Sequence, residues 1–301
     1  MDRRKATAAG LAALVLTAVG GTGCTRRTVA VAEPPDAQDA RDGDARQRVR
    51  GAADALVRAG SSDVRTGMEL LSGGTRLTIR GVGVFDYARR RGLLEVSLPD
   101  GRERPVTQVI APGSLFMKHR GAGVPADKWV EVDPRRLADG NLVTNGATDP
   151  LTAAALLRGA TSVRYAGAGE ARGEPVRRYT GTTDAAAAAR AATDGVRAQL
   201  AAAAKGFSSG AVPFEVWLDG RGLPRLLRYT FAFADSTGAG RGTGEGPEEG
   251  SGEGSGESAA EEPVEVVSTN ELHGFGRRVA VRLPPPAEVY RGTIAVPGQR
   301  P

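Results

Sequence analysis

The chain has 301 residues, 40% of them hydrophobic and only 5% aromatic, so its core must be built mainly from aliphatic side chains and alanine. Its single cysteine, Cys24, and two histidines, His119 and His273, exclude an internal disulfide and zinc-finger, haem-type and iron–sulfur sites. Forty basic and 35 acidic residues leave a small positive charge, so the distribution of charge along the chain is more informative than its total.

The N-terminus is typical of a secretory signal peptide. Basic residues at 3–5 precede an uncharged apolar run over 6–19, which is too short to cross a bilayer as a helix because about 20 residues are needed. Cys24 follows the small residues 20–23, and this arrangement resembles the lipobox of bacterial lipoproteins, in which the chain is cut before a cysteine that is then diacylated. We therefore expect a signal peptide over 1–23 and lipidation of Cys24.

This region has two alternative interpretations. Ordinary secretion would use Ala30-Val31-Ala32 as the cleavage site, but Arg26 and Arg27 separate it from the apolar run. A buried free thiol would need a surrounding core, which the sequence near Cys24 does not supply. Lipidation predicts a palmitate-type anchor that holds the protein on the extracytoplasmic face of the cell membrane. Residues 24–43 lack apolar periodicity and are expected to form a flexible tether.

Residues 44–290 are expected to form one domain. Apolar residues at helical spacing over 44–60, ended by Gly60, predict an amphipathic helix. Beyond it, apolar and polar residues alternate between turns rich in Gly, Pro and Asp, which predicts an antiparallel meander. Its strands are expected at 64–70, 76–80, 94–98, 106–110, 115–118 and 128–132.

Two helices are expected in the middle of the chain. Asp149 is placed to cap a helix that has Pro150 at its first position and ends at Gly159. The alanine-rich stretch 184–205 predicts one long helix, since alanine has the highest helix propensity. Between the two helices, strands are expected at 162–166 and 176–182, joined by a glycine-rich segment.

The last third predicts two hairpins and an insert. Asp219-Gly220 between the alternating segments 212–218 and 223–233 is a strong hairpin signal. A second pair is expected from 264–272 and 277–283, around Gly274-Phe275-Gly276. Residues 236–262 are almost wholly Gly, Glu, Ser and Ala, which cannot offset chain entropy by apolar burial, so a disordered insert is expected there. Residues 291–301 are expected to form a tail.

The order of these motifs resembles the LppX/LprG-type lipid-carrier lipoproteins of actinobacteria, whose fold is similar to that of the carrier LolA. The resemblance implies an α+β fold, namely a half-open antiparallel β-barrel (a curved sheet) with helices covering its concave face around an apolar cavity. It also implies carriage or presentation of acylated lipid or glycolipid. The matching residues lie at 128–132, 149–160 and 163–182, in the helix that follows from Asp184, and at 212–220, 275–279 and 284–285.

A carrier of this kind needs aliphatic side chains on the inner face of the sheet, because lipid chains bind there by leaving water. Gly81 and Gly83 are expected to allow curvature or close approach of strands. Alternation alone does not distinguish a hollow interior from an ordinary packed core. The residues predicted to line the cavity are Met68, Leu77, Ile79, Leu94, Val96, Leu115, Met117, Leu156, Leu227 and Phe231.

Three functions follow from this sequence in decreasing order of preference. The first is a non-enzymatic, membrane-anchored carrier whose partners are lipid or glycolipid acyl chains. The second is a structural or sensory cell-envelope lipoprotein with a filled core that contacts a partner protein. The third is a hydrolase, for which neither His119 nor His273 lies near a nucleophile signature. No cofactor or metal is expected, and scattered basic residues without interleaved aromatics do not indicate a nucleic-acid partner.

Overall fold

The computed structural model describes residues 35–72, 75–99, 104–121, 123–233 and 264–292. The predicted signal peptide, Cys24 and the whole of the insert expected at 236–262 lie outside these residues. The tail expected at 291–301 is described only to residue 292.

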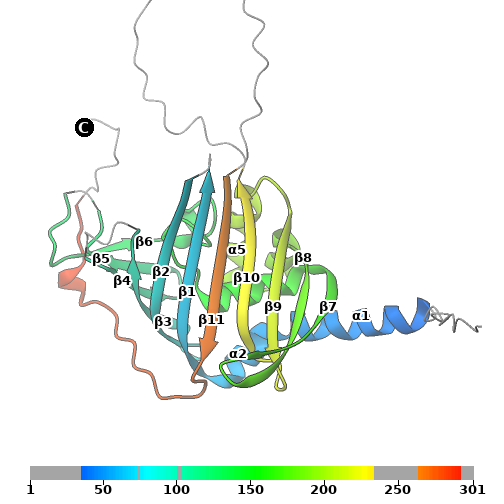
Figure 1. Ribbon diagram of the computed structural model, residues 1–301. Helices are drawn as coiled ribbons and strands as arrows, with labels where there is room; N and C mark the ends of the chain where they lie inside the picture. Colours follow the sequence, from blue (N-terminus) through cyan, green and yellow to red (C-terminus); the bar gives the residue numbers. More distant parts are fainter. Residues whose placement is uncertain (1–34, 73–74, 100–103, 122, 234–263, 293–301) are drawn as a thin grey trace, which may run out of the picture.

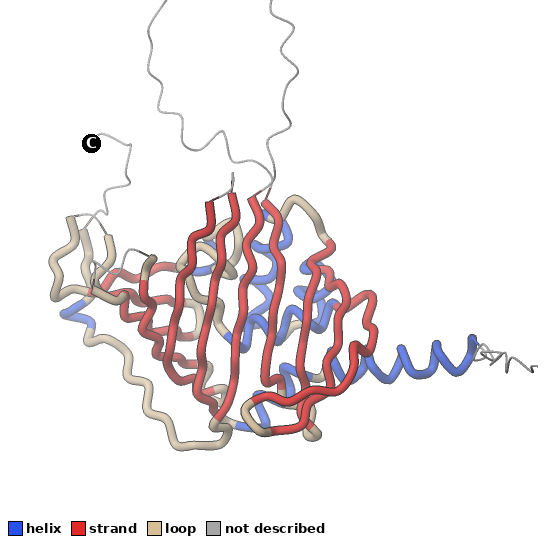
Figure 2. Tube along the Cα trace, in the orientation of Figure 1, coloured by secondary structure: helices blue, strands red, loops and turns tan. Residues whose placement is uncertain are grey.

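The fold is built on one antiparallel sheet of eleven strands that curves but does not close (Figure 1). The strands lie in the order β6-β5-β4-β3-β2-β1-β11-β10-β9-β8-β7, so β6 and β7 are the two edges. Helices lie on one side of the sheet, behind it in the view of Figure 2, and this confirms the predicted α+β architecture. The strands are β1 (Ser61–Ser72), β2 (Thr75–Asp86), β3 (Arg91–Ser97), β4 (Val106–Ala111), β5 (Ser114–Lys118), β6 (Trp129–Val132), β7 (Ala160–Ala171), β8 (Glu174–Asp184), β9 (Ala211–Asp219), β10 (Pro224–Phe233) and β11 (Val264–His273).

The helices supply the second layer. They are α1 (Pro35–Arg50), α2 (Ala52–Ala59), α3 (Pro150–Leu156), α4 (Ala185–Ala191) and α5 (Asp194–Gly206), with short 3-10 turns η1 (Pro134–Arg136), η2 (Leu157–Gly159) and η3 (Pro286–Glu288). Leu56, Leu156 and Leu200, from three of these helices, are fully buried in the same apolar cluster as the inward-facing strand residues. The face of the sheet turned toward the helices is called the concave face below.

Strand register decides which side chains share the concave face. On β1, Val64, Thr66 and Met68 point toward the helices, whereas Arg65 and Glu69 point to the opposite, outer face. Since directly paired residues lie on the same side of a sheet, the pairs Met68–Ile79 and Thr66–Asn270 extend this face across β2 and β11.

Both long predicted helices are broken. The helix expected at 44–60 begins at Pro35, within the expected tether, and Gly51 separates it into α1 and α2. The helix expected at 184–205 is α4 and α5, because Ala192 and Thr193 are extended. Here Thr193, Asp194 and Gly195, which are weaker helix formers than alanine, interrupt the alanine run.

The second predicted hairpin is wrong. Residues 277–283 form no strand, although β11 itself is present. The reason is that β11 is already paired with β1 on one side and with β10 on the other, so no edge is free for a further partner. The chain instead runs past η3 to the sheet edge, where Val289 bridges Trp129 of β6. The glycine-rich segment 167–173 also differs from expectation, since β7 continues to Ala171.

Candidate functional site

The structure gathers the predicted lining residues on the concave face. Nine of the ten lie on strands, and pairing register places all nine on that face. Ile79 is half-buried against the apolar cluster, whereas Leu77, near the end of β2, is 43% exposed. The remaining eight are buried together in the cluster, namely Met68, Leu94, Val96, Leu115, Met117, Leu156, Leu227 and Phe231.

A buried loop over residues 139–149, here called the interior loop, occupies part of the concave side. The carboxylate of Asp139 fixes its turn by accepting hydrogen bonds from the backbone N–H groups of Asn141 (3.0 Å), Val143 (2.6 Å) and Thr144 (2.6 Å). These bonds satisfy backbone groups that would otherwise be buried without partners, which is why an irregular segment can be buried here.

The interior loop is held to the sheet from two sides. The side chain of Gln108 on β4 donates to the Asn145 carbonyl oxygen (2.7 Å). The Thr148 hydroxyl lies 2.7 Å from that of Ser268 on β11. Between them, Gly146 has a positive φ of 76°, and a Cβ there would lie 3.0 Å from Ile79 Cγ2, so only glycine fits easily. Sequence reasoning missed this loop, although Asn145-Gly146 is a recognisable turn pair.

A cavity of about 710 Å³ lies where β3, β4 and β5 end, and is called the mouth cavity below. Leu98, buried Val106 and Val124 give it an apolar floor, and Arg104 and Arg120 are exposed at its rim. Pro125, Ala126, Gly121 and His119 complete the lining. Its size lies within the usual range of roughly 300–1,000 Å³ for small-molecule sites.

The floor of the mouth cavity continues into the concave face. Val106 pairs directly with Val96, a predicted lining residue that is 1% exposed. Arginine stays charged at all relevant pH values, so Arg104 and Arg120 place permanent positive charge beside this apolar surface. His119 faces the same space, and its Nδ1 lies 3.2 Å from the Pro105 carbonyl oxygen. The arrangement suits a ligand with an apolar body and an anionic end.

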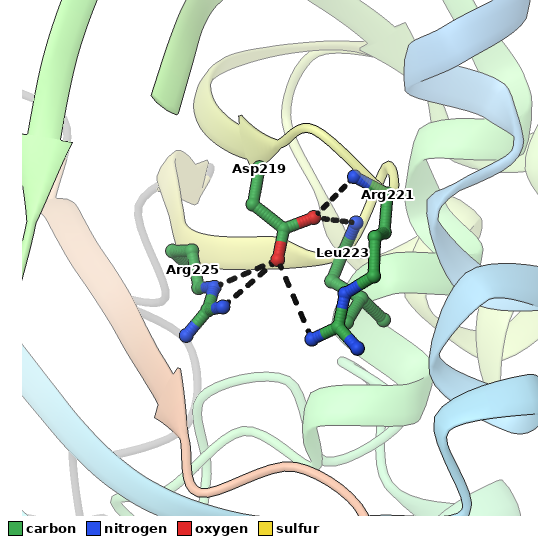
Figure 3. Close-up of polar contacts among 4 residues, drawn as sticks. All are labelled: Asp219, Arg221, Leu223 and Arg225. Atoms are coloured by element: carbon green, nitrogen blue, oxygen red, sulfur yellow. Dashed lines mark hydrogen bonds and ion pairs between the residues drawn. The ribbon is translucent and has the colours of Figure 1, made fainter. Parts of the chain in front are cut away.

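Other polar groups have structural roles. Asp219 organises the β9–β10 hairpin by accepting hydrogen bonds from the N–H groups of Arg221 (2.9 Å) and Leu223 (3.0 Å) and from the Arg225 guanidinium (2.9 and 3.1 Å; Figure 3). Asp149 caps α3 as predicted, through the Leu151 N–H (2.8 Å). Burial raises the pKa of the Asp149 carboxyl above its ordinary value.

Within the described ranges, no group of three or more His, Cys, Asp and Glu residues is arranged to hold a metal ion. A search of the same part of the chain finds no helix with the length and apolar character needed to cross a membrane.

No protein-family model and no curated protein matches this chain. Solved structures that are similar to it include LppX from Mycobacterium tuberculosis, with a TM-score of 0.41 and 12% identity over 80% of this chain and 100% of that chain. LprF from Mycobacterium bovis matches with a TM-score of 0.38 and 11% identity, over 80% and 97% of the two chains. A LolA superfamily protein from Nitrosomonas europaea matches with a TM-score of 0.31 and 9% identity, over 78% and 94%. These are the kinds of protein that the sequence motifs resemble.

Proposed function

We propose that this protein is a non-enzymatic carrier that binds the acyl chains of a lipid or glycolipid, and that Cys24 anchors it to the outer face of the cell membrane. The observation that carries the proposal is the mouth cavity, whose apolar floor at Val106 leads to the concave face through Val96. Each methylene moved from water onto such a surface contributes about 0.8 kcal/mol.

The polarity of the mouth cavity sets the expected orientation of the ligand. Acyl chains lie on Leu98 and Val106 and extend toward the ten predicted lining residues. A carboxylate or phosphate at the head of the lipid pairs with Arg104 or Arg120, because guanidinium groups bind both anions in bidentate geometry.

Lipid binding is tested with a soluble form that begins at Pro35. Organic extracts of the purified protein should contain lipid by mass spectrometry, and the lipid-free protein should bind a fluorescent fatty acid. Leu98→Trp narrows the mouth cavity and should weaken binding, whereas Val82→Trp, at an exposed position on the outer face, should not. Empty extracts and no fatty-acid binding would reject the carrier.

A second candidate function is favoured by the packing of the interior. Eight of the ten predicted lining residues are buried in one apolar cluster, as expected of a filled core in an envelope lipoprotein that contacts a partner protein. A folded protein that binds no lipid in the experiment above would support this candidate.

The proposed anchor has its own test in the full-length protein. Cys24→Ser should shift the protein from the membrane fraction to the soluble fraction, since a diacyl anchor binds far more firmly than a single chain. Retention of the Cys24→Ser variant in the membrane fraction would exclude lipidation of Cys24 as the anchor.

A further inference from the structure

Two neighbouring polar side chains lie buried at the centre of the concave face. Thr66 on β1 and Asn270 on β11 are directly paired, with exposed fractions of 6% and 0%. Within the described residues, the Thr66 hydroxyl and both polar atoms of the Asn270 amide have no hydrogen-bond partner. Since buried polar groups are almost always paired, three such atoms in one place require an explanation.

Several other polar side chains on this face have partners within the protein, whereas Oε1 of Gln108 on β4 is buried without one. The Ser62 hydroxyl lies 2.7 Å from the Tyr87 hydroxyl, and Ser268 makes the contact with Thr148 described above. Thr183 donates to the Leu156 carbonyl oxygen (2.6 Å). Thr66 and Asn270 differ from Gln108 because they are directly paired and none of their side-chain polar atoms has a partner within the described residues, whereas Gln108 Nε2 does.

The pair is connected to the mouth cavity by one cross-strand row. Thr66 pairs with Gly81, Gly81 with Val96, and Val96 with Val106, which lines the mouth cavity. Neighbouring strands are about 4.8 Å apart, so the row from Val106 to Asn270 spans about 19 Å. Apart from its polar end, the row presents two valines and a glycine, which suits an extended hydrocarbon chain.

The unpaired atoms determine which chemical group of a ligand could form hydrogen bonds with all of them. The Asn270 amide offers one acceptor and a pair of donor hydrogens, and the Thr66 hydroxyl can donate or accept. A hydroxyl on the ligand can donate to Asn270 Oδ1 and accept from Nδ2 or from Thr66. An ester carbonyl only accepts, so it would leave Oδ1 unpaired.

We propose that Thr66 and Asn270 form a selectivity site for a hydroxyl group carried along the acyl chain of the bound lipid. The inference rests on the proposed carrier function and specifies its ligand class. The chain lies along the row from Val106, with its head at the mouth cavity. A Cβ at Gly146 would lie 3.6 Å from Val96 Cγ1, so the interior loop covers the row and must shift where the chain passes.

The test compares 18-hydroxyoctadecanoate with octadecanoate, two fatty acids that differ by one hydroxyl at the far end of the chain, far enough from the carboxylate to reach Asn270 from the mouth cavity. Both are titrated into the lipid-free soluble form that begins at Pro35, in competition with a fluorescent fatty acid. The hydroxy acid should bind more tightly by about tenfold, which corresponds to one or two hydrogen bonds formed in a buried site. Asn270→Leu, which is similar in size, should remove this preference while octadecanoate binding is kept.

Matched variants separate the site from general effects. Thr269→Val alters the neighbouring residue on the outer face and should retain the preference for the hydroxy acid. If Asn270→Leu does not fold, Thr66→Val replaces it and should reduce the preference. Equal binding of both acids by the wild-type protein would contradict the proposed selectivity site but would agree with the proposed carrier function. A crystal structure in which only water contacts Asn270 while 18-hydroxyoctadecanoate is bound would also overturn the selectivity site. Failure of both acids to bind would instead reject the carrier function.

Discussion

The hydroxyl oxygens of Thr148 and Ser268 lie 2.7 Å apart, and through this contact the interior loop is fastened to the central strand β11. Thr148 also donates to the Leu142 carbonyl oxygen (2.6 Å), so one side chain closes the loop on itself and holds it to the sheet. Because the loop covers the concave face at Val96, along which the bound chain is proposed to lie, its stability bears on both folding and binding.

Thr148→Val should destabilise the protein by about 1–3 kcal/mol, because it leaves the Ser268 hydroxyl and the Leu142 carbonyl buried without this partner. The free energy of unfolding is measured by urea titration. Thr230→Val, on the outer face of β10, is the control and should change it little. Equal effects of the two substitutions would show that the Thr148 contacts do not hold the loop.

The buried Asp149 predicts a pH dependence of stability. Burial raises the pKa of its carboxyl in the folded protein, although hydrogen bonds from Thr152 and Leu151 oppose the shift. The contribution of Asp149 to the free energy of unfolding therefore depends on pH. It is fully present below the unfolded pKa of about 3.9, and it is lost as the pH rises through the higher pKa of the folded protein. Asp149→Asn keeps a capping side chain without the charge, and its unfolding free energy should not fall over that range. Parallel pH profiles for the two proteins, from urea titrations, would contradict this.

The two aspartates at positions 219 and 133 form ion pairs of similar length but different burial. Asp219 and Arg225 are 2.9 Å apart with side chains 6% and 10% exposed, whereas Asp133 and Arg135 are 2.7 Å apart with side chains 28% and 55% exposed. Asp219→Ala should cost about 3–5 kcal/mol in unfolding free energy, since it leaves the Arg225 charge buried and unpaired. Asp133→Ala should have a small effect, because water screens an exposed pair. If the two variants lose comparable amounts of unfolding free energy, as measured by thermal and urea unfolding, burial is not the deciding factor.

Substitution by alanine should have opposite effects on stability at two glycines in the strands. At Gly83 an added Cβ would overlap the Leu93 carbonyl oxygen of the paired strand, so the backbone must shift, and Gly83→Ala should cost about 1–3 kcal/mol or more. At Gly67 an added Cβ would meet nothing within 4 Å, and Gly67→Ala should raise stability by about 0.4–1 kcal/mol through the unfolded chain. Melting temperatures of the two variants that move in the same direction would refute this reading.

Features decided by neighbouring residues were predictable from the sequence. The Asp219-Gly220 hairpin and the Asp149 cap depend on groups within six positions of each aspartate, and both are present. The interior loop was not predictable, because its burial depends on Gln108 and Ser268, which are distant in the chain. The second hairpin failed for the same reason, since the pairing of β11 on both sides is a property of the whole sheet.

For the candidate site, alternation placed nine residues correctly on one face, because a period of two requires only local backbone geometry. It did not find Val106 or Leu98 as lining residues of the mouth cavity, which forms where the β3–β4 and β5–β6 connections meet. Nor did it single out Thr66 and Asn270, whose significance lies in the partners they lack rather than in their position along a strand.

Helix α1 packs against one end of the edge strand β7. At this end Ala45 and Val49 are buried and the Arg50 guanidinium donates to the carbonyl oxygen of Ala160, the first residue of β7 (2.7 and 3.2 Å). An uncovered edge strand is a template for pairing with another molecule, and so for aggregation. Helix α1 therefore shields only the Ala160 end of this edge, whereas most of β7 beyond Val163 is exposed. Proteolytic loss of α1 would uncover that end and also separate the folded body from the anchor proposed at Cys24.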